Sequence, residues 1–414
     1  MKKIIIIVLF IIMGSSIYYI YENYSKEEIK NVIPISGSAY VNNYYIYGTS
    51  FNLNGYLENP INIKDIKLIL YNNEIETEIP FNYDLVENQI NFYISNLLNT
   101  GYQLDNTKLG DNYLLFKITF LDDTYQYYRL ENQTEYEYLK YYTLSTVNHL
   151  ITINTDNNYN TFNLKTEKNK DENIYDITID PGHGGKDPGA CSQGNCEKSI
   201  TLEISKMLKE KLESSGLKVN LTRDEDETIP NYNMNNQLGR AVIPNESNSK
   251  YLFSIHLNSH VNKKMYGVEI LSPGNIDYTF AKNLADRITQ YTASAYSINK
   301  GYKLYEGVYF RKMTAQDVAD HIKENGELSY NVKEGANYYF MIRETGGILT
   351  GAYIDNRNVE NGENPYYNSN KGVESYILEL GYIINKKEIQ NILNNKEKYV
   401  NAIYDSIMEK INSY

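Results

Sequence analysis

Residues 174–185 read Ile-Tyr-Asp-Ile-Thr-Ile-Asp-Pro-Gly-His-Gly-Gly. The apolar run that ends at Ile179 predicts a β-strand, so His183 comes just past the end of that strand. In an open α/β sheet, ligands bind outside the carboxyl ends of the strands. A polar side chain at this position is therefore a stronger functional candidate than one elsewhere in the chain.

The chain after this strand alternates between helical and extended patterns. Residues 199–213 carry apolar side chains at helical spacing, and Gly216 follows as the expected end of that helix. Further strands are predicted at 219–221, 251–255 and 376–380, and further helices at 278–291, 387–394 and 396–411. Alternation of this kind predicts an α/β catalytic domain over 174–414, with an open, mostly parallel twisted sheet and helices on both faces.

The preceding region, residues 31–163, shows a different pattern. Apolar residues alternate with polar ones in short runs, as in Ile66/Leu68/Leu70 and Leu114/Phe116/Ile118, and turn residues separate the runs. The pattern predicts an all-β, sandwich-like domain. Its residues indicate no chemistry, which favours a spacer or binding module, and the charged stretch 165–173 predicts the boundary to the next domain.

The amino terminus is typical of a targeting segment. Lys2 and Lys3 precede an unbroken apolar run over 4–13, and the stretch stays largely apolar to Tyr21. Residues 1–25 are therefore predicted to be a signal anchor or a signal peptide, and the lack of a clear cleavage site favours an anchor, a membrane segment with the rest of the chain outside. A chain that has crossed the membrane can hold a disulfide, so Cys191 and Cys196 are predicted to form either a small disulfide or a pair of free thiols.

Length and charge exclude other classes of protein. A chain of 414 residues predicts two or three domains, and 42% hydrophobic with 22% charged residues is a globular composition. The 52 acidic and 40 basic residues give a net charge of −12, which argues against nucleic acid as a partner.

Three further residues join His183 as candidates for chemistry. His256 ends the strand Tyr-Leu-Phe-Ser-Ile-His, Glu379 lies near the end of Tyr-Ile-Leu-Glu-Leu-Gly, and Glu197 immediately precedes the helix at 199–213. Parallel strands would bring His183, His256 and Glu379 to one edge of the sheet, and Glu197 could reach the same edge. Two imidazoles and one carboxylate are the usual ligands of a catalytic zinc ion, and a second carboxylate would then act as the base.

A series of blocks, in this order, resembles the zinc-dependent N-acetylmuramoyl-L-alanine amidases of the amidase 3 family. The resemblance covers residues 174–414. The blocks are Asp180-Pro-Gly-His-Gly-Gly-Lys-Asp-Pro-Gly-Ala190, Glu197-Lys198, Leu221-Thr-Arg-Asp224, Ser254-Ile-His-Leu-Asn-Ser259, Gly267-Val-Glu269 and Leu378-Glu-Leu-Gly-Tyr-Ile383.

The resemblance implies a role for each candidate residue. His183, Glu197 and His256 are expected to bind one zinc ion, and Glu379 is expected to be the catalytic glutamate. Arg343 is expected to hold a carboxylate or carbonyl of the substrate. That substrate is expected to be peptidoglycan at the bacterial cell envelope, cleaved between the lactyl group of N-acetylmuramic acid and the L-alanine of the stem peptide.

Other interpretations stay open from the sequence. The domain could grip peptidoglycan without cutting it, or it could be a zinc peptidase of the stem peptide. Residues 314–325 predict a capped amphipathic helix, which is either an ordinary packing helix or a gate over the zinc site, and a protein activator is left open. Arg223 is expected to be structural, paired with Asp224 and Asp226, whereas His260 and His321 are expected to have no role.

Overall fold

The computed structural model describes most of the chain. The described residues are 33–47, 50–58, 61–86, 89–94, 107–133, 142–145, 149–156, 161–170, 174–231, 237–274, 278–325, 332, 334–345, 370–371 and 373–412. The predicted targeting segment at 1–25 lies outside these ranges. No helix within these described ranges is both long enough and apolar enough to cross a bilayer.

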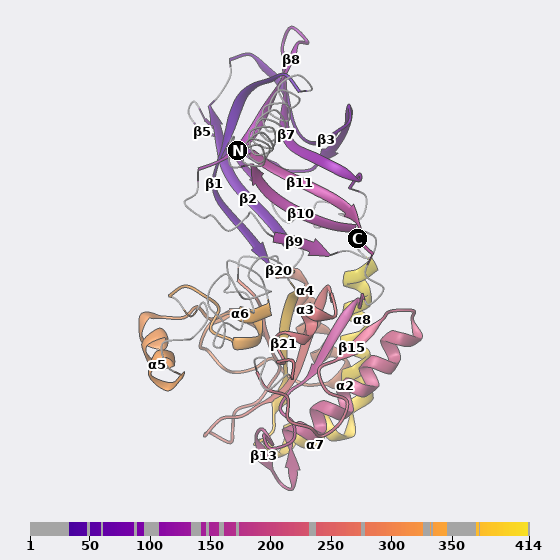
Figure 1. The fold of residues 1–414 in the computed structure, drawn as a ribbon. Coiled ribbons are helices and arrows are strands. Elements are labelled where there is room, and N and C mark those ends of the chain that lie inside the picture. The colour runs from indigo at the N-terminus through magenta and orange to yellow at the C-terminus, as the bar shows by residue number, and fades with distance from the viewer. Residues whose placement is uncertain are drawn as a thin grey trace, which may run out of the picture.

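The amino-terminal half of the structure is one large sheet of 12 strands (Figure 1). The order along it is β20-β9-β10-β11-β7-β8-β1-β2-β6-β5, while β3 pairs with β7 and carries β4. Two pairs are parallel, β1 with β8 and β20 with β9, and the others are antiparallel. The strands are β1 (Ile35–Tyr47), β2 (Ser50–Glu58), β3 (Ile63–Asn72), β4 (Ile75–Ile79), β5 (Asn82–Val86), β6 (Gln89–Ile94), β7 (Gly110–Phe120), β8 (Tyr125–Asn132), β9 (Tyr142–Ser145), β10 (His149–Asp156), β11 (Thr161–Lys168) and β20 (Asn370–Lys371).

The prediction of a sandwich-like domain over 31–163 is wrong, because these strands belong to one hydrogen-bonded sheet. The sheet curls so that one face encloses its main core, to which most of the strands contribute, and a smaller apolar cluster that includes Ile69 and Leu115 lies on the other face. Within that core, the ring of Phe116 lies 4.9 Å from that of Phe92 and 5.2 Å from that of Phe81. Period-two alternation shows which side chains face inward, but it does not show which strands are neighbours. One curled sheet and two packed sheets therefore give the same pattern.

The carboxy-terminal half contains a second sheet of seven strands in the order β15-β12-β16-β21-β17-β19-β18. Its first four strands are parallel, but β17 is antiparallel to β21 and β18 is antiparallel to β19. β17 and β19 are again parallel, so four of the six neighbouring pairs are parallel, as predicted, and the two antiparallel pairs make this half a mixed α/β domain. The strands at this end of the sheet, β17, β18 and β19, are too short to show a hydrophobic period in the sequence. The strands are β12 (Ile177–Pro181), β15 (Val219–Leu221), β16 (Tyr251–Asn258), β17 (Glu269–Leu271), β18 (Lys303–Tyr305), β19 (Val308–Tyr309) and β21 (Glu374–Tyr382).

Helices cover this sheet unequally (Figure 1). On one face the long helices α2, α4 and α8, with α7, form the main core with the inward side chains of β12, β16 and β21. A smaller core on the other face contains α6 and leaves room for a cavity. The helices are α2 (Glu197–Ser214), α3 (Ile243–Glu246), α4 (Thr279–Thr292), α5 (Ala315–Asn325), α6 (Phe340–Thr345), α7 (Lys386–Asn394) and α8 (Lys396–Asn412).

The two sheets meet through β20. Asn370 and Lys371 pair in parallel with Tyr142 and Thr143 of β9, at the edge of the larger sheet. The chain then enters β21, a central strand of the smaller sheet, within three residues. The strand that carries Glu379 is thus attached at its start to the amino-terminal sheet.

We expect Phe116→Ala to destabilise the amino-terminal sheet by about 3–5 kcal/mol, because it removes a fully buried ring from the main core of that sheet. Leu121→Ala, at a side chain that is 66% exposed just after β7, is the control and should change the free energy of unfolding by less than about 0.5 kcal/mol. Urea denaturation followed by circular dichroism measures both. Equal effects of the two changes would contradict the enclosed core.

Candidate metal centre

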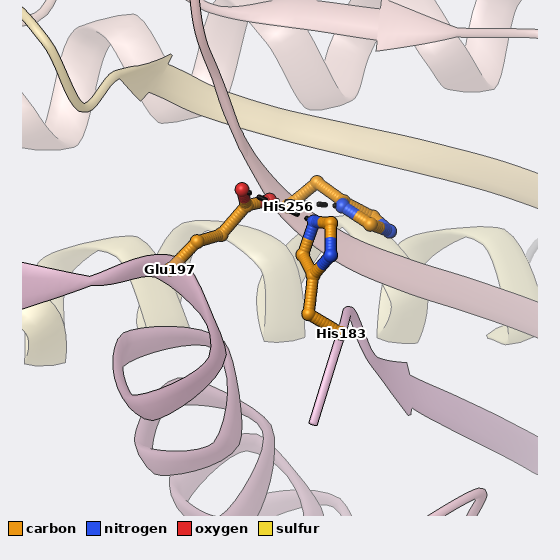
Figure 2. Close-up of side chains that lie close together, drawn as sticks. All are labelled: His183, Glu197 and His256. Carbon is orange, nitrogen blue, oxygen red and sulfur yellow. Dashed lines mark hydrogen bonds and ion pairs between the residues drawn. The ribbon is translucent and has the colours of Figure 1, made fainter. Parts of the chain in front are cut away.

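Three side chains from separate elements converge on one point (Figure 2). His183 follows the end of β12, Glu197 is the first residue of α2, and His256 lies in β16. Because β12 and β16 are adjacent and parallel, their carboxyl ends bring the two imidazoles to the same edge. Helix α2 packs against both strands and places its first turn at that edge.

Glu197 lies between the two rings. Its Oε2 is 3.1 Å from Nε2 of His183, and its Oε1 is 2.9 Å from Nδ1 of His256. The backbone N–H groups of Ala190 and Leu257 donate to the same two oxygens, at 3.2 and 2.9 Å. One nitrogen or oxygen from each of the three side chains lies within 4.8 Å of the others, so the group could hold a metal ion.

The electrostatics of this group follow from burial and close contact. Burial alone would raise the pKa of Glu197, but the hydrogen bonds and charges of His183 and His256 hold it at about 2. Burial would lower the pKa of His183, and the carboxylates of Glu197 and Asp187 raise it instead. Glu197 is therefore ionised at neutral pH, which is the form that binds a cation.

Asp187 orients the ring of His183. Its Oδ2 lies 2.7 Å from Nδ1 of His183, and its Oδ1 accepts from the N–H of Gly189 at 3.0 Å. A carboxylate on the second nitrogen is the usual outer contact of a metal-binding histidine, because it fixes the ring and its tautomer. Here the contact leaves Nε2 of His183 facing Glu197.

Two glycines make the close approach of the three side chains sterically feasible. A Cβ atom at Gly182 would lie 2.4 Å from the ring of His256, and one at Gly189 would lie 2.7 Å from Oε2 of Glu197. Gly189 also has a φ of +63°, which disfavours other residues. A side chain at either position would displace a candidate ligand.

A disulfide-closed hairpin leads directly into Glu197. The strands β13 (Cys191–Ser192) and β14 (Asn195–Cys196) pair, and a disulfide joins Cys191 to Cys196, so the structure has the first of the two states left open by the sequence. Helix α2 begins at Glu197, two residues earlier than predicted. The candidate ligand is therefore fixed between a covalent clip and a helix.

Glu379 lies on the same face of the sheet as His256. The two residues are direct partners across β16 and β21, and Glu269 of β17 is the partner of Glu379 on the other side. Burial, together with the nearby charges of Glu197 and Glu269, raises the pKa of Glu379 well above its usual value. Its Oε2 is buried and has no hydrogen-bond partner within the described part of the chain. Such an unpaired acid beside a possible metal group is available for proton transfer.

A cavity of about 710 Å³ opens beside the two histidines. Arg343 of α6 lines it, although this side chain is only 2% exposed. Nε of Arg343 donates to Glu344 at 2.7 Å, and Nη1 donates to the carbonyls of Asn337 and Tyr338. Within the described residues Nη2 makes no hydrogen bond, so this guanidinium retains a donor. Glu379 is not among the residues that line the cavity.

Helix α5 forms another wall of the cavity. Asp317, Asp320 and His321 line it, so His321 lies nearer to the site than the sequence indicated. The predicted cap is present, because the N–H of Thr314 donates to Asp317 at 2.8 Å and the N–H of Asp317 donates to Oγ1 of Thr314 at 3.2 Å. Gating by this helix stays a prediction. His260 accepts a hydrogen bond from the N–H of Asn262 and does not line the cavity.

Buried polar residues that the sequence did not single out support the site. Asp180 is fully buried, and although burial alone would raise its pKa, the charge of Arg240 and two hydroxyl groups lower it.

Arg223 is structural, as expected, but it donates to the carbonyls of Pro181, Gly182, Lys198 and Glu225 and forms no hydrogen bond with Asp224 or Asp226. Asp187 stood within a quoted block and could have been noticed, whereas Arg240 had no local signal.

Comparisons with known proteins match the carboxy-terminal half. A family model described as N-acetylmuramoyl-L-alanine amidase matches residues 177–412. The chain is 31% identical over 152 residues to the amidase AmiA of Salmonella typhimurium, covering 35% of this chain and 49% of that one. It is 32% identical over 114 residues to AmiA of Escherichia coli (27% and 37% covered) and 38% identical over 96 residues to AmiC of Neisseria meningitidis (23% and 21% covered). The chain thus spans less than half the length of these relatives.

We expect the double change Cys191→Ser and Cys196→Ser to lower the free energy of unfolding by about 2 kcal/mol, because it releases a short loop in the unfolded chain. Urea denaturation measures the loss. A reductant should destabilise the unchanged protein by the same amount and leave the double variant unaffected. A variant as stable as the unchanged protein would show that the disulfide does not stabilise the fold.

Proposed function

The chain belongs to the N-acetylmuramoyl-L-alanine amidase family known as amidase 3, and from this premise we propose that it is a peptidoglycan hydrolase. The bond that it cleaves is the amide between the lactyl group of N-acetylmuramic acid and the L-alanine of the stem peptide. The observation that carries the proposal is the cluster of His183, Glu197 and His256, with the unpaired acid Glu379 on the same face of the sheet.

His183, Glu197 and His256 would together hold one zinc ion. Two imidazoles and one carboxylate match the donor set of catalytic zinc sites, and the buried charge of Glu197 is contacted by the two rings and by two backbone N–H groups. When bound, zinc supplies Lewis acidity, which polarises a carbonyl and favours deprotonation of water. Asp187 would keep the ring of His183 in the orientation that binding requires.

Glu379 would take the proton of the attacking water and then give it to the leaving amine of L-alanine. Burial and the nearby charges of Glu197 and Glu269 raise the pKa of Glu379, which makes its carboxylate a stronger base for the first step. Its Oε2 is free of other hydrogen bonds within the described residues, so proton transfer breaks no existing contact of that oxygen.

Arg343 would bind a carboxylate or carbonyl of the stem peptide in the cavity beside the metal cluster. The support for this role is the Nη2 donor left over after the other contacts of the side chain. A buried guanidinium binds oxygen atoms more strongly than an exposed one, because less water competes for it.

The proposed place of action is the bacterial cell envelope, where the substrate lies. The disulfide between Cys191 and Cys196 supports an oxidising compartment. The targeting segment at 1–25 stays a prediction. A catalytically silent binding module is disfavoured, because all four expected positions carry residues capable of the chemistry.

We expect Glu379→Gln to reduce the release of stem peptides from purified peptidoglycan by at least about 10³-fold, because the amide cannot accept the proton. The same variant should still bind zinc, whereas His183→Ala should lose both zinc and activity. Mass spectrometry of the products measures the reaction, and elemental analysis measures the metal.

Three results would contradict the proposal. Activity retained by Glu379→Gln would exclude this residue as the base. Products cut within the stem peptide, with the bond to the lactyl group intact, would instead identify a zinc peptidase. Binding of peptidoglycan without any product would identify a silent module.

We expect Arg343→Lys to raise KM about tenfold with little change in kcat, because one charged hydrogen bond to the substrate is worth roughly 1.5 kcal/mol. Lysine keeps the positive charge beside Glu344 but lacks the Nη2 donor. Arg287→Lys is the matched control, since Arg287 pairs with Glu409 on the far helical layer. An unchanged KM in Arg343→Lys would exclude the proposed contact.

A further inference from the structure

The backbone of His183 is held in an unfavourable conformation. Its φ is +61°, in the left-handed region that side chains other than glycine rarely adopt, and Gly184 and Gly185 follow with φ of +135° and +58°. Residues in such conformations persist only where their surroundings hold them. The contacts of this turn therefore determine where the ring of His183 lies.

Arg240 makes the contact that holds the turn at His183 itself. Its Nη2 donates to the carbonyl of His183 at 2.7 Å, and its Nη1 donates to the carbonyl of Pro181 at 2.8 Å and to the carboxylate of Asp180. Arg240 is 7% exposed and lines the cavity. A single planar guanidinium thus joins the backbone of one candidate ligand to a fully buried acid.

Asp180 extends this connection to the strand of the second histidine. Its two oxygens also accept hydrogen bonds from the hydroxyls of Thr222, at 2.5 Å, and Ser254, at 2.6 Å. Ser254 lies in β16, two residues before His256 and on the same face. A chain of hydrogen bonds therefore runs from the carbonyl of His183 through Arg240 and Asp180 to Ser254, in the strand that carries His256.

The neighbouring arginine holds a different part of the same turn. Arg223 donates to the carbonyls of Pro181 and Gly182 at 3.0 Å, but not to that of His183. A change at Arg240 would therefore leave the carbonyls of Pro181 and Gly182 held by Arg223, whereas the carbonyl of His183 would lose its contact with a guanidinium.

We propose that Arg240 is a positioning residue, which holds the carbonyl of His183 against Asp180 and thereby sets how tightly the His183, Glu197 and His256 cluster binds its metal ion. The inference rests on the proposed function, because it concerns the same cluster. Lysine cannot replace the guanidinium here, since one ammonium group cannot reproduce the planar, two-sided contact with Asp180 and His183.

The test compares Zn²⁺ affinity in the full chain and in Arg240→Lys, by competition with a chromophoric chelator. Outer contacts of metal ligands typically change metal affinity 10- to 100-fold, so we expect a loss of at least tenfold. The visible spectrum of the Co²⁺-loaded protein should also change, because the ring of His183 shifts. The melting temperature of the metal-free protein should change little, since lysine keeps the charge beside Asp180.

Lys410→Gln is the matched control. Lys410 forms a buried ion pair with Glu374, at the opposite end of β21 from Glu379. This variant should lose stability but keep both its Zn²⁺ affinity and its Co²⁺ spectrum. An equal loss of affinity in the control would overturn the proposal, because the effect would then reflect general destabilisation.

Arg240→Lys with affinity within twofold of the unchanged protein would also overturn the proposal. If Arg240→Lys does not fold, Ser254→Ala takes its place, with an expected loss of at least threefold and the same twofold limit. A failure of the unchanged protein to bind one Zn²⁺ would overturn the proposed function itself. Normal Zn²⁺ binding and hydrolysis by both the unchanged protein and Arg240→Lys would overturn only the positioning role.

Discussion

A buried carboxylate between two imidazole rings is the interaction on which the catalytic half of this structure depends. Removing the charge of Glu197 from water is costly, and it is tolerated because two rings and two backbone N–H groups contact its oxygens. Those contacts come from two separate segments, the stretch after β12 that holds His183 and Ala190 and the part of β16 that holds His256 and Leu257. The arrangement therefore requires that β12, β16 and the start of α2 are held together firmly.

The two faces of the smaller sheet have different roles, one in packing the strands together and the other in carrying the site. The face covered by α2, α4 and α8 is apolar and closely packed, which fixes the strands relative to one another. On the opposite face are His256, Glu379 and Asp180, with the cavity beside them. Because side chains alternate across a strand, one strand such as β16 serves both faces, with Ile255 in the core and His256 at the site.

The candidate site could be located from the sequence because its residues stand at positions with a structural meaning. A histidine directly after a buried strand, or a glutamate before an amphipathic helix, can be recognised without coordinates. The contacts around these residues could not be recognised in this way. Arg240 lies 57 residues after His183 along the chain, and no periodicity indicates that its guanidinium reaches the carbonyl of His183. The short strands β17, β18 and β19 were missed for a related reason, since two or three residues show no period.

The sequence by itself determined which residues are apolar at regular spacing, and hence where the longer strands and helices lie and which side chains end them. It also left two states for Cys191 and Cys196. Only the tertiary structure decided that the amino-terminal strands form one curled sheet, that the second sheet is mixed, and that Arg223 binds carbonyls and not Asp224 or Asp226. The reason is physical. The spacing of apolar residues indicates whether each side chain is buried or exposed, whereas strand neighbours and buried polar contacts depend on segments that meet only when the chain folds.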